Sequence, residues 1–498
     1  EYSNDGFILP ANIWNMTPVS TTNVVGANTY AWLVENRISS VEIYKIRITD
    51  SSDATVSATT NSSFKIRGDF NITSPVGGET WLVGENNRVV TWTTTGTINN
   101  VNLQYSKDGI SWFILKKSDG SDAFGLVNDG NEMITVPDAI TSTFRVRVLD
   151  SNDSTVSKDS NQLTVKGRLT VNVPASSDLW KVGENRVITW TATGSIPANV
   201  KLEYWNGGTS QWIEIIASTP VTTTGNQGSY LWNNLPNLIR DDVKVKVTQV
   251  NDPAVNDESD SFKMRGQLAI NNPTAGNIYY VYNATYQTQT YPITYTVTGS
   301  IGTVKIEYSL DSGGIWTLIQ TQAAGAPGVY GINWSVPITP SKTCLVRISD
   351  NAYPVSESNG VSGQFEIRGQ VNVVISPVST DIWSVGETNR TIYYSVVGNI
   401  GNVTLQYKKL DGSWGDITTM ATNPGALNNY TWPSVADVIT TTAQVRVKPD
   451  AVLDRADPAE SQSFTIRSKI TTGSPKTGDI LQVGESWLIT YTYTGTIS

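Results

Sequence analysis

Histidine is absent from the 498 residues, and cysteine occurs once, at Cys344. General acid–base catalysis and transition-metal binding depend mostly on these two residue types. A single thiol also excludes a disulfide within the chain. Because Cys344 alternates with Val346 and Ile348, we interpret it as a small apolar core residue of a strand. We therefore predict that the chain is not an enzyme.

Charge and long apolar runs are also scarce. Charged residues make up 16% of the chain, the net charge is −9 and the sequence pI is about 4.8. No basic patch is present to bind a phosphate backbone, so nucleic acid is not an expected partner. No apolar run approaches the ~20 residues that span a bilayer, so we expect no membrane span in this segment.

What the chain does contain is typical of β-sheets. Thr, Ser, Asn, Val and Gly are frequent, and there are 16 Trp and 21 Tyr residues. A chain of this length is too long for one hydrophobic core. The composition therefore predicts several all-β domains.

One motif repeats along the chain and defines the domains. Phe64-Lys65-Ile66-Arg67-Gly68 recurs four times, at intervals of 99, 99, 103 and 99 residues. This period is the size of one immunoglobulin-type β-sandwich. The predicted domains are the C-terminal part of a sandwich at 1–68, complete sandwiches at 69–167, 168–266, 267–369 (divergent) and 370–468, and the opening strands of a further one at 469–498.

Within each period, apolar residues alternate with Thr, Lys or Arg, as in Val90-Thr91-Trp92 and Val146-Arg147-Val148. Such strands have one buried and one wet face, which predicts antiparallel immunoglobulin-like sandwiches. Only a Gly and one residue separate the motif that ends one repeat from the first strand of the next. The sequence therefore predicts a tandem array that forms a rigid rod.

The run from Ser74-Pro75 through Gly78, Trp81 and Gly84, followed by Val-Thr-Trp and a late Tyr-x-Trp, recurs through the chain. It resembles the immunoglobulin-like repeat of the Ser/Thr-rich, glycolipid-anchored cell-wall family, which is similar to repeats in large prokaryotic surface proteins. The resemblance implies a surface location and a wall or stalk architecture. It implies no catalytic residues.

The two ends of the sequence complement each other. Glu1-Tyr2-Ser3-Asn4-Asp5-Gly6 matches Gln104-Tyr105-Ser106-Lys107-Asp108-Gly109 in mid-domain, whereas 469–498 supplies opening strands. Either the sequence is a window on a longer array, or the last strands of one copy complete the first half-domain of the next copy. The residues that we assign to such assembly are Lys469, Trp487, Ile489, Tyr491, Tyr493, Glu1 and Tyr2.

Acidic turns precede the final strand of most domains. Carboxylates near a domain junction are candidate calcium ligands, although Asp is equally favoured in solvated turns. The sequence gives no complete calcium loop, and calcium is the one cofactor that we consider. The candidate residues are Asp50, Asp53, Asp150, Asp153, Asp257 and Asp260.

The repeated Trp and Tyr residues are predicted to lie in the core, because they hold fixed positions in alternating strands. Trp14, Trp205 and Tyr353 fall outside those positions and are candidates for exposed aromatic residues. Glycans are possible partners, because Asn-x-Ser/Thr recurs at Asn61, Asn71, Asn283, Asn389, Asn402 and Asn429.

The sequence thus predicts a structural component of an extracellular fibre, stalk or surface layer. The expected partner is the chain itself, head to tail and also laterally. The alternative is an adhesin or carbohydrate-binding array on a cell surface, in which one divergent domain binds a ligand. A third interpretation is the non-catalytic spacer of a larger secreted enzyme.

Overall fold

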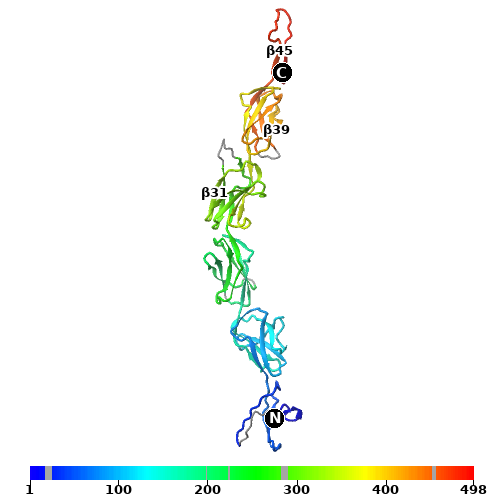
Figure 1. Ribbon diagram of the computed structural model, residues 1–498, viewed down its shortest axis with the longest axis vertical. Helices are drawn as coiled ribbons and strands as arrows, with labels where there is room; N and C mark the ends of the chain where they lie inside the picture. The colour runs from blue at the N-terminus through cyan, green and yellow to red at the C-terminus, as the bar shows by residue number, and fades with distance from the viewer. Residues whose placement is uncertain (17–24, 198, 223–224, 282–289, 451–455, 498) are drawn as a thin grey trace. The chain divides into compact units, whose positions relative to one another are not determined.

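The computed structural model describes residues 1–498 except 17–24, 198, 223–224, 282–289, 451–455 and 498. Apart from one 3-10 turn, η1 (Pro10–Asn12), the regular structure of the described residues is β-strand. The strands form sheets in which most pairs are antiparallel (Figure 1), and they confirm the predicted all-β, immunoglobulin-like array. Compact unit 1 comprises Glu1–Asp178, Arg186–Trp232 and Asp242–Phe262, and unit 2 comprises Leu179–Asn185, Asn233–Asp241 and Lys263–Ser498.

Unit 1 contains the sandwich formed by residues 69–167. One of its sheets has the strand order β10-β12-β7-β5, and the other has the order β11-β8-β13-β15-β6. Strand β6 pairs with β15 in parallel. The strands are β5 (Asp69–Ser74), β6 (Thr80–Leu82), β7 (Arg88–Thr95), β8 (Asn100–Ser106), β9 (Phe113–Ile114), β10 (Lys116–Lys117), β11 (Leu126–Val127), β12 (Asn131–Thr135), β13 (Thr141–Asp150), β14 (Ser157–Asp159) and β15 (Leu163–Lys166).

Unit 1 also contains the first 68 residues and most of the repeat at 168–266. The N-terminal strands are β1 (Tyr2–Ser3), β2 (Ile13–Trp14), β3 (Lys45–Thr49) and β4 (Ser57–Thr59), in the order β2-β1-β3-β4. The strands of the next repeat that lie in this unit are β16 (Arg168–Val173), β18 (Arg186–Thr193), β19 (Asn199–Asn206), β20 (Gln211–Pro220), β21 (Gln227–Trp232), β23 (Val245–Gln249) and β24 (Asn256–Glu258).

Unit 2 begins with β17 (Leu179–Lys181), which pairs in parallel with β25 (Phe262–Arg265); β22 (Arg240–Val243) spans the boundary between the units. The sandwich at 267–369 follows. Its strands are β26 (Gln267–Asn272), β27 (Ile278–Tyr280), β28 (Tyr291–Thr298), β29 (Thr303–Ser309), β30 (Thr317–Ala323), β31 (Gly328–Trp334), β32 (Ser341–Asp350), β33 (Asn359–Val361) and β34 (Phe365–Arg368).

The sandwich at 370–468 and a terminal hairpin complete unit 2. The hairpin, β45 (Lys469–Ser474) with β46 (Thr490–Thr494), is red in Figure 1, and no second sheet of described strands packs on it. The strands of the sandwich are β35 (Gln370–Ser376), β36 (Ile382–Ser384), β37 (Arg390–Val397), β38 (Asn402–Lys408), β39 (Trp414–Ala421), β40 (Leu427–Trp432), β41 (Thr440–Ala443), β42 (Val445–Pro449), β43 (Ala459–Glu460) and β44 (Phe464–Arg467).

Alternation along the strands builds each core. In β13, Phe144, Val146 and Val148 are fully buried, whereas the residues between them are partly exposed. Period-two side chains point to opposite faces of a sheet, so one face of β13 packs inward. Trp92 of the facing sheet is 3% exposed, and its indole Nε1 donates to Asn128 Oδ1 at 2.7 Å.

Cys344 lies on the inner face of β32 and is fully buried, as predicted. Its thiol donates to the main-chain oxygen of Ser341 at 3.3 Å. Burial raises the pKa of the thiol to about 11. The thiol therefore stays protonated and acts as a core side chain.

Replacing Trp92 by alanine is expected to destabilise the 69–167 sandwich by about 3–5 kcal/mol, because it removes a buried indole and leaves a cavity. Hydrogen exchange of the β7 and β8 amides measures the loss without requiring two-state unfolding of the whole chain. Trp112→Ala is the control, because Trp112 is only half-buried. Equal effects of the two substitutions would contradict the assignment of Trp92 to the core.

Candidate functional site

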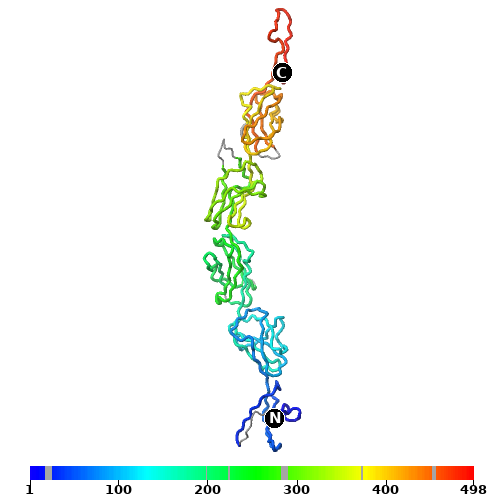
Figure 2. The backbone as a smooth tube through the Cα atoms, viewed as in Figure 1, coloured from blue at the N-terminus to red at the C-terminus, as the bar shows by residue number. Residues whose placement is uncertain are grey.

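The most regular feature outside the cores is the junction between successive repeats. Strand β15 ends at Lys166 and β16 begins at Arg168, with only Gly167 between them. The backbone trace in Figure 2 follows the chain in order from its N-terminal to its C-terminal residues. Single residues also separate β25 from β26, β34 from β35 and β44 from β45. So short a connection brings the end of one repeat against the beginning of the next, and each such junction lies within one unit.

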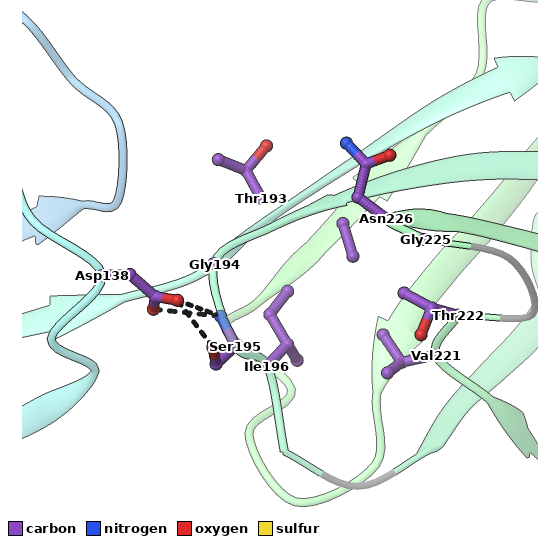
Figure 3. Close-up of a pocket in the computed structure, with 10 residues that line it drawn as sticks. Asp138, Thr193, Gly194, Ser195, Ile196, Val221, Thr222, Gly225 and Asn226 are labelled. Carbon is purple, nitrogen blue, oxygen red and sulfur yellow. Dashed lines mark hydrogen bonds between the residues drawn. The ribbon is translucent and has the colours of Figure 1, made fainter.

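One polar contact crosses the junction at Gly167. The carboxylate of Asp138 accepts hydrogen bonds from the main-chain N–H of Ser195, at 3.0 Å, and from its hydroxyl, at 2.6 Å (Figure 3). Ser195 follows Gly194 at the turn after β18. Asp138 therefore satisfies a turn N–H of the next repeat that has no ladder partner.

The same position makes the same contact at the other junctions. Asn36, Asn237 and Asp437 take the place of Asp138 and accept with their side chains. In the divergent repeat, the main-chain oxygen of Ile338 is the acceptor. The pairs are Asn36 Oδ1 with Thr97 N (2.9 Å), Asn237 Oδ1 with Ser300 N (2.8 Å), Asp437 Oδ1 with Thr496 N (3.3 Å) and Ile338 O with Asn399 N (2.8 Å).

We did not identify these residues from the sequence. A detectable signal exists, because residues 36, 138, 237, 338 and 437 recur with almost the period of the terminal strand motif. Each lies in a loop that no apolar alternation marks. Their role becomes visible only when the next repeat is in place.

An apolar contact accompanies the polar one. Gly194 has φ +88, and a Cβ there would lie 3.0 Å from Val83 of the preceding repeat. The positive φ and this close approach both favour glycine. The same valine position meets the same glycine position in the pairs Val182 with Gly299, Val281 with Gly398 and Val385 with Gly495.

Ion pairs form the third contact at four of the five junctions. A basic residue of the terminal motif of one repeat reaches an acidic residue in the late turn of the next. The pairs are Lys65 with Asp153 (2.9 Å), Lys166 with Asp252 (2.8 Å), Lys263 with Glu357 (2.6 Å), Arg265 with Glu357 (2.6 Å) and Arg368 with Asp457 (3.3 Å).

Arg265 makes the most buried of these ion pairs. Its side chain is 1% exposed and contacts the carboxylates of Asp241 and Glu357, and its guanidinium lies 3.7 Å from the ring centroid of Tyr353. Removing one partner of a buried ion pair leaves the other charge uncompensated, which is costly. The junction between 168–266 and 267–369 therefore contains the most buried charge among these ion pairs.

The proposed calcium ligands have other partners in the structure. Asp50 and Asp53 accept hydrogen bonds from Ser52 and Thr55 of their own turn, and these bonds lower the pKa of both carboxyls. The remaining contacts are Asp150 Oδ1 with Asn152 N (2.8 Å), Asp153 with Thr155 and Lys65, Asp257 Oδ2 with Val171 N (2.8 Å) and Asp260 O with Ser259 Oγ (2.8 Å).

Within the described residues, no group of three or more His, Cys, Asp or Glu side chains is placed to hold a metal ion. Calcium binding stays a prediction. The carboxylates of Asp50, Asp53, Asp150, Asp153 and Asp257 instead accept hydrogen bonds within their own repeat, and that of Asp153 also pairs with Lys65 of the preceding repeat; the contact of Asp260 is through its main-chain oxygen.

The prediction that every recurrent Trp lies in the core is wrong for one position. Trp81, Trp92, Trp180 and Trp383 are buried, but Trp112 and its equivalents are half-buried. Each of the latter stacks under a cation that occupies one face of the ring and comes from the same sheet, from the strand beyond the neighbouring one. The pairs are Trp112 with Arg147 (3.7 Å), Trp212 with Lys246 (4.0 Å), Trp316 with Arg347 (4.2 Å) and Trp414 with Arg446 (4.3 Å).

The aromatic residues outside the repeat pattern also have partners. Trp14 lies 5.3 Å from Tyr2 with Arg37 over its ring, Trp205 packs 5.5 Å from Trp212, and Tyr353 lies under buried Arg265. We identify no exposed aromatic platform for a sugar among them. Five of the possible glycan acceptors, Asn61, Asn71, Asn389, Asn402 and Asn429, are exposed, and Asn283 lies outside the described residues.

At the N-terminal part, Tyr2 is fully buried in a small cluster with Tyr44 and Ile66. Its hydroxyl donates to Glu35 at 3.0 Å, and burial is the main cause that raises its pKa to about 12. Glu1 pairs with Arg47 at 2.8 Å. Beside the cluster is a groove of about 640 Å³, lined by apolar and polar side chains that include Met16, Trp32, Ile46, Ile48 and Arg47.

The C-terminal hairpin leaves the matching apolar face open. Ile489, Tyr491 and Tyr493 are 67%, 60% and 59% exposed, and Trp487 is 43% exposed. In the repeat at 168–266, the corresponding Ile188 and Trp190 are fully buried. Lys469 pairs with Thr494 at the base of the hairpin and is exposed. These residues therefore form one uncovered half of a sandwich core.

Comparison with known proteins gives structural likeness only. No family model matches the chain, and no curated protein matches it. Similar solved structures include the N-terminal eight Ig domains of Down Syndrome Cell Adhesion Molecule isoform 1.30.30 (10% identity, 91% of this chain and 70% of that chain, TM-score 0.19). Others are the N-terminal four Ig domains of Dscam1 isoform 1.9 (10%, 80% and 100%, 0.22) and the fibronectin(III)-like modules of Clostridium thermocellum CbhA (16%, 40% and 92%, 0.15).

At such identities and TM-scores the matches carry no argument about function. No helix among the described residues is long and apolar enough to cross a membrane. The junction contacts, the small N-terminal core with its groove and the uncovered face of the C-terminal hairpin are therefore the features that bear on function.

The junction at Glu357 is expected to weaken in acid. Hydrogen bonding from Lys263 is the largest effect that lowers the pKa of Glu357 below 4.5. The ionised carboxylate of Glu357 therefore stabilises the folded chain fully above pH 4.5, and this stabilisation is lost as the pH falls through the lowered pKa. We expect Glu357→Gln to lower the melting temperature at pH 6 and to have a smaller effect below about pH 3. Differential scanning calorimetry across this range tests the difference.

Asp411→Asn is the matched control, because Asp411 is exposed and accepts hydrogen bonds only within its own turn in the described structure. A loss of stability in Glu357→Gln that does not change with pH would contradict an electrostatic role of Glu357.

Proposed function

We propose that this chain is a structural, non-enzymatic component of an extracellular fibre, stalk or surface layer. The observation that carries the proposal is the junction. One polar contact recurs at all five junctions, and the valine–glycine contact and the ion pair each recur at four of the five. In a catalytic or ligand-binding protein, only the residues of one site need a fixed geometry. A spacer needs similar contacts at all of its junctions, since its function is to hold successive domains in a fixed relation.

Support also comes from the aromatic residues. An adhesin that binds carbohydrate would present free aromatic faces, but the half-buried tryptophans stack with Arg or Lys. No described feature favours the adhesin or the enzyme spacer over the structural role. The surface location follows from the family resemblance and stays part of the proposal.

The proposed function includes a cover for the exposed face of the C-terminal hairpin, in one of two ways. The half-core on β45–β46 is either completed by further residues of the same polypeptide or by the N-terminal part of a second copy. Open apolar faces of this size are not stable in water, so we expect one of these two partners. Strand donation is supported by the groove beside Trp32, which lies where the opening strands of a complete repeat pack.

Cryo-electron microscopy of the native material distinguishes continuation of the same polypeptide from strand donation by a second copy. Density that runs on from the hairpin into a third strand of the same polypeptide would show a longer covalent array. Two chain ends that meet within one sandwich would show strand donation. Isolated particles with both half-cores uncovered would contradict the proposed function in either form.

For strand donation, Ile489→Asp combined with Tyr491→Asp is expected to abolish concentration-dependent self-association, because it places two charges in the composite core. Sedimentation velocity of the 498-residue chain measures the association. Thr492→Asp is the control, since alternation puts Thr492 on the opposite face of β46. Self-association that survives the double substitution would contradict the role of this face.

A further inference from the structure

One acidic turn and one basic strand end have no junction partner in the described structure. Asp53 lies in the turn between β3 and β4, and Arg467 ends β44. Both are exposed, and neither has an ion-pair partner among the described residues. At the four other junctions, by contrast, a base of the terminal motif meets an acid of the late turn.

Asp53 reproduces the geometry of Asp153. Asp153 Oδ1 accepts from the N–H and hydroxyl of Thr155, at 3.1 and 2.6 Å, which leaves Oδ2 for Lys65. Asp53 Oδ1 accepts from the N–H and hydroxyl of Thr55, at 2.9 and 2.5 Å. The turn therefore holds the second carboxylate oxygen of Asp53 in the orientation that binds an incoming cation.

Arg467 occupies the position of the cation. It is the fourth residue of Phe464-Thr465-Ile466-Arg467, and the fourth residues of the other motifs are Arg67, Lys166, Arg265 and Arg368. Three of them reach an acid of the following repeat: Lys166 with Asp252 (2.8 Å), Arg265 with Glu357 (2.6 Å) and Arg368 with Asp457 (3.3 Å). At the first junction Arg67 contacts Thr155 instead, and the second residue of the motif, Lys65, binds Asp153. The repeat that follows Arg467 is the one that the β45–β46 hairpin begins.

We infer that Arg467 of one copy pairs with Asp53 of a second copy when the hairpin of the first completes the N-terminal half-domain of the second. The inference rests on the proposed strand donation and adds to it a specific electrostatic contact. The partner is thus a second copy of this chain, bound through an apolar face and one ion pair.

This ion pair gives the assembly a direction and a register. Along the chain the basic residue always belongs to the earlier repeat and the acid to the later one. The same order between copies admits head-to-tail contact and disfavours contact between two like ends. A slip of the hairpin by one residue would also turn its apolar residues away from the core.

Charge exchange tests the contact. Asp53→Lys and Arg467→Asp are each expected to weaken self-association of the 498-residue chain about tenfold, because each places like charges together. The double variant is expected to recover most of the affinity, as in a double-mutant cycle. Asp411→Lys is the control for a change of charge alone. Sedimentation equilibrium gives the dissociation constants.

Chemical cross-linking provides a second measurement that does not depend on a charge effect. In Asp53→Cys combined with Arg467→Cys, a short bis-maleimide is expected to yield covalent dimers and longer chains, since Cys344 is buried. Asp411→Cys combined with Arg467→Cys is expected to give none. Both variants change only exposed side chains, so both are expected to fold.

These outcomes distinguish failure of the ion pair from failure of strand donation. If the parent chain associates but the single charge variants bind normally, or the double variant shows no recovery and no cross-link forms, strand donation stands and the ion pair is wrong. If the parent chain stays monomeric at all concentrations, strand donation and the ion pair are both overturned.

Discussion

A linker of one residue is the constraint on which the junctions of this protein depend. With only Gly167 between β15 and β16, the loops at the end of one sandwich are pressed against the turn that follows Gly194 in the next. The N–H of that turn is covered and needs an acceptor. Asp138 supplies it, Val83 fills the space beside the glycine, and Lys166 reaches the acidic turn beyond.

The junction keeps its geometry while its side chains vary. Asp, Asn and a main-chain carbonyl all accept the same hydrogen bond, because the acceptor position is set by the backbone rather than by residue type. Lys and Arg exchange in the ion pair for the same reason. The divergent repeat at 267–369 has lost its capping side chain and has gained the buried Arg265 contact at its other end.

The N-terminal segment and the C-terminal hairpin are each an incomplete sandwich. Tyr2, Tyr44 and Ile66 form a small core on one side, and Ile489, Tyr491 and Tyr493 present an uncovered face on the other. A sandwich is stable only when both sheets are present, since each sheet buries one face against the other. The requirement for a second layer therefore couples folding of these segments to assembly or to chain continuation.

The sequence by itself determined the sandwich class and the inner face of each strand, because period-two alternation and a 99-residue repeat follow from local geometry and domain size. It also placed Cys344 in a core. Only the tertiary structure decided that Trp112 stacks under Arg147 at the surface, that Asp138 binds Ser195 and that Asp153 binds Lys65. These contacts join residues from different strands or repeats, so their distances are set by how sandwiches fold and abut, which no local pattern records.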